Sequence, residues 1–199
     1  DYINREVRNW VQQAPQPAGT TLTALTIRSW TATVAHVGDS RLYLLRHGNL
    51  RQITTDHNDN EPVETRNRAG YPVTIERSVL QKAIGKTDTI SPDVTTFSLQ
   101  PGDRLLMTTD GVTNQITDDE IREVLATNSL SAIPDDLVEL SNTRDNKDNA
   151  SVIALEVLAE SYERDTWVAD PDDRVYVGGP AWYLELRPPQ EMNTAYSAL

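Results

Sequence analysis

Three aspartates of this chain share one local context, the end of an apolar segment. Asp39 follows the strand-like run TATVAHV within HVGDSR, Asp110 ends LLMTTD, and Asp148 stands just before the apolar run that starts at Ala150. An aspartate at the tip of a buried strand is held by its neighbours near the edge of a sheet. We therefore expect tips on adjacent strands to bring these carboxylates close together.

Carboxylates that lie close together repel one another, and they do not all stay ionised without a counter-charge. A divalent cation supplies that charge, and oxygen donors without Cys or His favour Mg²⁺ or Mn²⁺ over Zn²⁺. Gly38 and Gly111 fit such a site because glycine lets backbone and water approach closely. The alternative is that each aspartate only ends a strand or caps a turn.

Composition narrows the class of protein. The 199 residues carry 30 acidic and 18 basic side chains, a net charge of −12, which argues against binding to nucleic acid or to an anionic membrane. The absence of cysteine excludes disulfides and thiolate metal sites. No apolar run approaches the roughly 18 residues of a membrane span and no signal sequence opens the chain, so we expect a cytoplasmic protein.

The apolar spacing predicts a strand-rich chain with grouped helices. We expect helices within residues 1–13, from residue 118 after a capping box of Thr117 with Glu120, and over residues 135–141. We expect strands at residues 21–28, 31–37, 41–46, 50–54 and 150–158, with two more around the Pro101-Gly102 turn. Residues 56–72 are polar and predicted to be irregular and mobile. This order favours an α+β fold with antiparallel sheets.

One shorter stretch only partly matches a metal-binding motif, and the three histidines match none. The stretch DHNDNEPVETRN begins like a calcium loop, but Glu61 stands where that loop needs glycine and Asn67 where it needs a bidentate glutamate. His36, His47 and His57 have no cysteine partner and no spacing typical of metal ligands, so we assign them core, turn or capping roles.

Several longer motifs together are specific for one family. The stretches TATVAHVGDSRLYLLRHGNLRQITTDHN, SVLQKAIG, LQPGDRLLMTTDGVTNQITDDEI and DNKDNASVIALEV occur in this order. Over residues 1–158 the chain thereby resembles the metal-dependent protein serine/threonine phosphatases of the PP2C (PPM) family, in the compact form of its bacterial members. The resemblance implies an α-β-β-α sandwich of two antiparallel sheets flanked by helices.

The resemblance also implies roles for the three aspartates. Asp110 and Asp148 would bind the main catalytic metal, and Asp39 would match the acid of a further, more weakly held metal. Gly38, Gly111 and Asn149 would then lie beside two or three Mn²⁺ or Mg²⁺ ions. Because water activated by the metals is the family's nucleophile, we expect no catalytic residue from the protein itself. The implied substrates are phosphoserine and phosphothreonine proteins, with a cognate serine/threonine kinase as a partner, and residues 56–72 would form the family's flap.

One part of the family pattern is not in this chain. No Asp-Gly-x-Gly-Gly stretch and no suitable Asn-Glu-Asp stretch occurs, so the expected sandwich is incomplete at its N-terminus and exposes a sheet edge. Three interpretations stay open: part of an active phosphatase, a PP2C-like domain without catalysis that binds or regulates, and an unrelated β-rich scaffold stabilised by a cation. Residues 159–199 are predicted to be a tail, a linker or a short appended hairpin.

Overall fold

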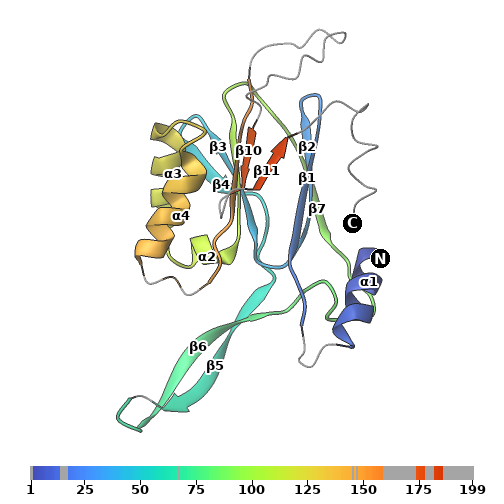
Figure 1. The fold of residues 1–199 in the computed structure, drawn as a ribbon, viewed down its shortest axis with the longest axis vertical. Coiled ribbons are helices and arrows are strands. Elements are labelled where there is room, and N and C mark those ends of the chain that lie inside the picture. The colour runs from blue at the N-terminus through green and yellow to red at the C-terminus, as the bar shows by residue number, and fades with distance from the viewer. Residues whose placement is uncertain are drawn as a thin grey trace. The chain divides into compact units, whose positions relative to one another are not determined.

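The computed structural model describes residues 2–13, 18–66, 68–144, 146, 148–158, 174–177 and 182–185. The chain divides into two compact units (Figure 1), one made of Asp1–Tyr43 with Arg51–Leu99 and the other of Leu44–Leu50 with Gln100–Leu199. None of the helices that the structure describes combines the length and the apolar composition that a membrane crossing requires.

The first unit is built on a three-stranded antiparallel sheet in the order β1-β2-β7, formed by β1 (Leu22–Arg28), β2 (Thr31–Val37) and β7 (Asp93–Ser98). The central strand alternates, with Ala32, Val34 and His36 buried on one face. Such alternation is typical of a strand with one face in the core. It confirms the predicted strands at residues 21–28 and 31–37.

Helix α1 (Tyr2–Val11) belongs to the same unit and is anchored by one polar residue. Asn4 is 2% exposed, its Oδ1 accepts from Gly85 N at 2.8 Å, and its Nδ2 donates to Thr87 O at 3.0 Å. These bonds hold the helix against the loop that follows β6.

Residues 56–72, predicted to be irregular, are instead largely a strand. β5 (Asn58–Arg66) pairs with β6 (Pro72–Leu80) along its whole length, and Figure 1 shows the two as one long hairpin. The prediction was wrong because Asn, Asp, Glu and Pro are poor strand formers, so propensity gave no strand signal. Cross-strand pairing stabilises the hairpin, with Val63 opposite Ile75 and Thr65 opposite Val73.

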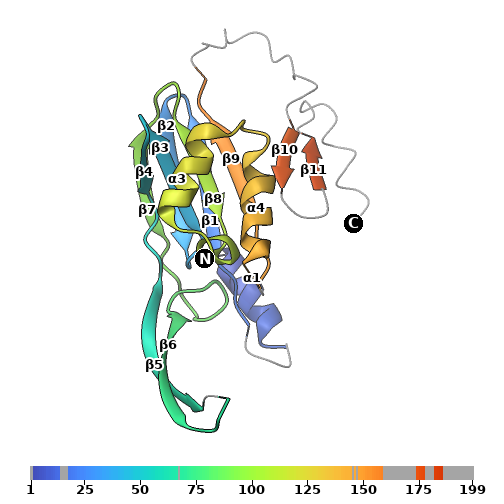
Figure 2. The same ribbon diagram turned by 90° about the vertical axis from the view of Figure 1, so that its left-hand side faces the viewer.

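The second sheet has the order β4-β3-β8-β9, with β3 (Arg41–Arg46), β4 (Asn49–Gln52), β8 (Arg104–Thr108) and β9 (Val152–Glu156). In the second unit, α2 (Asp110–Thr113) follows β8 directly, α4 (Ile133–Thr143) packs on β9, and α3 (Asp118–Thr127) lies beside α4 (Figure 2). The core of this unit is apolar and includes Leu105, Leu106, Ile121, Leu125, Ile133, Leu137 and Val152.

The start of α3 confirms the predicted capping box. The hydroxyl of Thr117 accepts from Glu120 N at 3.4 Å, and Glu120 Oε2 accepts from Thr117 N at 3.0 Å. This reciprocal pair satisfies two amide groups that the first turn of a helix leaves without a partner.

Two short strands, β10 (Arg174–Val177) and β11 (Trp182–Glu185), pair with each other in antiparallel fashion. The rest of the predicted tail, residues 159–199, lies outside the described residues. The boundary at residue 158 stays a prediction.

Candidate metal centre

Residues 38–41, the Gly38 turn, join β2 to β3 and carry Asp39, which is half-buried. Gly38 has a φ of +117°, and a Cβ at this position would lie 2.4 Å from Thr21 Cγ2. A larger residue would therefore be strained and would clash at once. Glycine ends β2 at Val37 for this reason and places Asp39 beyond the strand.

Two buried histidines hold the Gly38 peptide. Gly38 N donates to His57 Nδ1 at 3.0 Å, and Gly38 O accepts from His36 Nε2 at 2.9 Å and from His57 N at 2.8 Å. Burial, together with the nearby His57, lowers the pKa of His36, so the neutral ring is favoured. The structure confirms core and turn roles for these two histidines, and His47 lies in an exposed turn with a φ of +50°.

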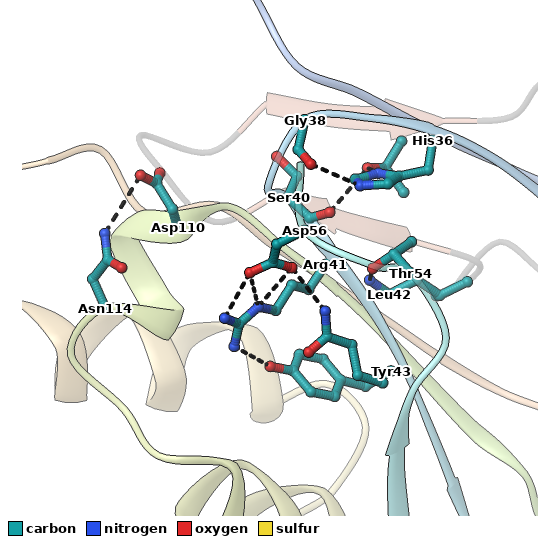
Figure 3. A network of polar contacts seen from close by, with 12 residues as sticks. His36, Gly38, Ser40, Arg41, Leu42, Tyr43, Thr54, Asp56, Asp110 and Asn114 are labelled. Carbon is teal, nitrogen blue, oxygen red and sulfur yellow. Dashed lines mark hydrogen bonds and ion pairs between the residues drawn. The ribbon is translucent and has the colours of Figure 1, made fainter. Parts of the chain in front are cut away.

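The far end of the Gly38 turn is held by an ion pair (Figure 3). Arg41 Nε and Nη2 both donate to Asp56 Oδ2, at 2.9 and 2.7 Å, and Arg41 Nη1 donates to Tyr43 Oη at 2.9 Å. Gln52 Nε2 donates to Asp56 Oδ1 at 2.7 Å. Partial burial opposes the charge of Arg41, but its bonds to Asp56 and Tyr43 outweigh this and raise its pKa.

The other two candidate ligands flank the paired ends of β8 and β9. The ladder ends at Thr108 opposite Val152, and beyond it Thr109 N donates to Ser151 O at 3.1 Å. The Thr109 hydroxyl accepts from Ser151 N at 3.0 Å and donates to Asn149 O at 3.3 Å. These bonds continue the strand pairing up to Asp110.

Gly111 is buried against the main chain of Asn149. A Cβ at Gly111 would lie 2.4 Å from Asn149 O and 2.9 Å from its carbonyl carbon. Residues 109–111 and 149–151, the Gly111 contact, are therefore in direct main-chain contact. Because Asp110 precedes Gly111 and Asp148 precedes Asn149, the fold brings the two segments that carry these aspartates together.

The side chains of both aspartates have local partners. Asp110 begins α2, and Asn114 Nδ2 donates to its Oδ2 at 3.4 Å (Figure 3). Asp148 is exposed, its Oδ1 accepts from Asn149 N at 2.8 Å, and its N–H donates to Asn146 Oδ1 at 3.0 Å. Local bonds of this kind are typical of Asp and Asn in tight turns, and here they shape the chain around Asp148.

A second ion pair holds the chain just before Asp148. Arg144, the C-cap of α4, donates from Nη2 to Glu120 Oε1 at 2.5 Å and from Nη1 to Gln115 O at 2.7 Å. The bonds from Arg144 and from the main chain and hydroxyl of Thr117 lower the pKa of Glu120 to about 2. The end of α4 is thereby fixed to the start of α3.

The candidate ligands are suited to a hard cation because they are carboxylates, whose oxygen atoms such cations prefer. Thr108 Oγ1 and Asn146 Nδ2, each two residues before a candidate ligand, are buried without a hydrogen-bond partner, and ordered water commonly satisfies such atoms. Within the described ranges, no three His, Asp or Glu side chains form a metal-binding cluster. Asp39 lies in the first unit and Asp110 and Asp148 in the second, so their convergence stays a prediction.

Sequence reasoning missed the residues that hold the Gly38 turn. The sequence places Asp56 in the polar stretch 56–72 and Arg41 at the start of a predicted strand, and neither position predicts that the two side chains pair. Their side chains meet across 15 residues of sequence, and no local spacing rule links positions that far apart within strands and turns. The available signal is the polar pair Asp56-His57, which begins two residues after the predicted strand at residues 50–54.

Sequence comparison finds related phosphatases. Residues 2–150 match the family described as protein phosphatase 2C. The protein phosphatase PhpP of Streptococcus pneumoniae is 33% identical over 158 residues, which are 76% of this chain and 63% of that protein. The chain thus spans somewhat less than two thirds of the length of this relative.

Solved structures give the same result. The serine/threonine phosphatase PstP/Ppp of Mycobacterium tuberculosis matches with a TM-score of 0.64 and 27% identity, covering 78% of this chain and 68% of that chain. The catalytic domain of PstP in complex with two manganese ions matches with a TM-score of 0.63 and 28% identity, covering 78% of this chain and 66% of that one. These likenesses confirm the predicted α+β sandwich class. With the family match over residues 2–150, they show that the chain belongs to the protein phosphatase 2C family.

Proposed function

We propose that this chain is part of a metal-dependent protein phosphatase that hydrolyses phosphoserine and phosphothreonine in protein substrates. Membership of the protein phosphatase 2C family and relatives named as serine/threonine phosphatases support the proposal. The observation that carries it is the Gly111 contact, which places the segments of Asp110 and Asp148 side by side at one end of a sheet.

We assign Asp110 and Asp148 to the main metal and Asp39 to a further, more weakly held metal. Mn²⁺ or Mg²⁺ fits these oxygen donors, and a related phosphatase has been crystallised with two manganese ions. When bound, two or three such ions neutralise phosphate charge and lower the pKa of water, which then serves as nucleophile. The side-chain amide of Asn114 orients the carboxylate of Asp110, and the backbone N–H of Asn149 orients the carboxylate of Asp148. Gly111 lets the two segments lie close together.

Three polar side chains in the segments around these ligands have structural roles. His36 and His57 hold the Gly38 peptide, and the hydroxyl of Thr109 bridges to residues 149 and 151. The chain also contains no cysteine. We therefore assign the attack on phosphorus to water and no covalent step to a protein side chain.

The partners of this activity follow from the chemistry. A phosphatase that acts on phosphoserine and phosphothreonine removes the phosphate that a serine/threonine kinase adds. We therefore include such a kinase as the opposing partner. We also assign the hairpin of β5 and β6, which includes most of residues 56–72, to the family's flap, near the entrance for the substrate.

The test is metal-dependent hydrolysis. The full protein should hydrolyse an aryl phosphate and a phosphothreonine peptide with added Mn²⁺, and chelation should stop turnover. The variant Asp110→Asn should lose more than about 100-fold in rate, because a metal supplies several kcal/mol of transition-state stabilisation. Asp119→Asn is the matched control, since Asp119 is an exposed acid in the first turn of α3. Hydrolysis that is independent of metal or of Asp110 would contradict the proposal.

The alternative function is that of a catalytically inactive PP2C-like domain that regulates or binds another molecule. The same assay separates the two functions. Binding of the phosphothreonine peptide without turnover at any Mn²⁺ concentration would favour the binding domain.

A further inference from the structure

Two consecutive residues, Asp56 and His57, form hydrogen bonds with the two ends of the Gly38 turn. Asp56 accepts from the guanidinium of Arg41 at 2.7 to 3.1 Å, at the downstream end of the turn. His57 accepts from Gly38 N through Nδ1 and donates its own N–H to Gly38 O, at the upstream end. Asp39 lies between these two anchoring points.

His57 is itself held by contacts with other segments of the first unit. His57 O accepts from Gln81 N at 2.7 Å, and His57 Nε2 lies 3.1 Å from Asp93 Oδ2. Lys82 Nζ donates to Asp93 Oδ1 at 2.9 Å. Bonds to Lys82 and to His57 lower the pKa of Asp93, so its carboxylate stays charged.

The turn needs this support because its own backbone is permissive. Gly38 has a φ of +117°, and glycine populates positive and negative φ about equally readily. An aspartate beside an unsupported glycine would sample many orientations, and ordering it would cost conformational entropy on metal binding. Bonds at both ends of the turn remove that freedom before any cation arrives.

We propose that Asp56 and His57 are positioning residues that preset the carboxylate of Asp39 for a divalent cation. The proposal rests on the proposed function in one respect, the assignment of Asp39 as a metal ligand. Neither residue touches the cation. Both act through the Gly38 turn, as partners behind a metal ligand generally do.

Mn²⁺ binding to the full protein without substrate tests the proposal. Free Mn²⁺ is followed by electron paramagnetic resonance during titration. Asp39→Asn should abolish the weaker Mn²⁺ site. Asp56→Asn should keep that site but raise its dissociation constant about 10-fold, and Asp56→Glu should recover part of the loss. The tighter binding should stay unchanged in all three variants.

The control is an equivalent ion pair elsewhere. Asp103 is 1% exposed and accepts from Arg46 Nε and Nη2 at 2.7 and 2.6 Å, in the second unit. Asp103→Asn should lower the melting temperature at least as much as Asp56→Asn and leave the Mn²⁺ titration unchanged. An equal shift of the titration in Asp103→Asn would mean general destabilisation and overturn the proposal.

The remaining outcomes separate this proposal from the proposed function. If Asp39→Asn abolishes the weaker site while Asp56→Asn changes its dissociation constant less than about twofold, positioning is refuted and the metal assignment stands. If Asp39→Asn leaves the titration unchanged, there is no ligand to position and the proposal is refuted. Should Asp56→Asn not fold, Gln52→Ala removes only the 2.7 Å bond to Asp56 and should weaken the same site two- to threefold; no change would refute positioning.

Discussion

The Gly38 turn and the Gly111 contact carry the proposed metal ligands, and they are built by different means. Side chains hold the Gly38 turn, with Thr21 against the glycine, His36 and His57 on its peptide and Asp56 on Arg41. Main chain forms most of the Gly111 contact: the carbonyl of Asn149 lies too close to Gly111 to leave room for a Cβ, Thr109 N donates to Ser151 O, and the hydroxyl of Thr109 adds side-chain bonds to this main chain.

This difference has consequences for tolerance to change. A side chain can be shortened or can rotate away, so defects in the Gly38 turn should be partly repairable by a second substitution. The carbonyl of Asn149 lies just beyond the β8–β9 ladder, in a segment whose main chain is bonded to Thr109, and it cannot move without breaking those bonds. We therefore expect the Gly111 contact to tolerate substitution less well than the Gly38 turn.

The largest expected effect is that of Gly111→Ala. The new methyl group would overlap Asn149 O, so residues 109–111 and 149–151 must move apart, at a cost of about 3 kcal/mol in the free energy of unfolding. Urea unfolding measures this loss, and Mn²⁺ binding by Asp110 and Asp148 should weaken with it. A loss below about 1 kcal/mol would show that the two segments separate at little cost. It would contradict the expectation that the Gly111 contact tolerates substitution less well than the Gly38 turn.

Gly38→Ala should be somewhat less damaging, about 2 kcal/mol, from backbone strain and overlap with Thr21. Gly48→Ala is the control for strain alone, because Gly48 has a φ of +77° with nothing within 4 Å of its added Cβ. Adding Thr21→Gly to Gly38→Ala should restore part of the stability. If it restores none, the side-chain description of this turn is wrong.

A smaller effect concerns acid stability beside the Gly111 contact. The folded-state pKa of Glu120 is about 2, below its ordinary value of 4.5, because Arg144 and Thr117 stabilise the carboxylate. Its contribution to stability is therefore complete above about pH 4.5 and is lost as the pH falls towards 2. The melting temperatures of the wild type and of Glu120→Gln should differ at pH 6 and converge near pH 2. Glu123→Gln, on the exposed side of α3, is the control and should show no such convergence.

The smallest effect concerns His36, which lies in β2 and donates to Gly38 O. Burial and the neighbouring His57 place its folded-state pKa below the ordinary value of 6.5, so the unfolded chain binds the proton more readily. Stability from this group is complete above about pH 6.5 and falls as the pH drops through that value. Imidazole NMR should show a titration midpoint below 6.5, and a midpoint above it would contradict the burial argument.

The strands with a clear apolar pattern were predictable from sequence. The predicted bounds 31–37 and 41–46 are those of β2 and β3: β2 alternates because one of its faces is buried, whereas β3 is a continuous apolar run that is buried over residues 42–45. The capping box of Thr117 with Glu120 was equally predictable, since it depends only on spacing within one turn of helix.

The hairpin of β5 and β6 was not predictable in this way. The residues of β5 have low strand propensity, and the order of the hairpin comes from pairing between positions as far apart as Asn58 and Leu80. The roles of Asp56 and His57 were hidden for the same reason, because their partners lie 15 and 19 residues away. Such pairs are set by how strands register.

By itself, the sequence determined the family, the type of donor atom and the strand ends at which Asp39, Asp110 and Asp148 stand. Those properties depend on residue identity and short-range spacing. Tertiary structure decided which segments meet, Gly111 against Asn149 and Asp56 with His57 around the Gly38 turn. Contacts of this kind arise only when strands distant in the chain pair in one register, and no local pattern of residues encodes that register.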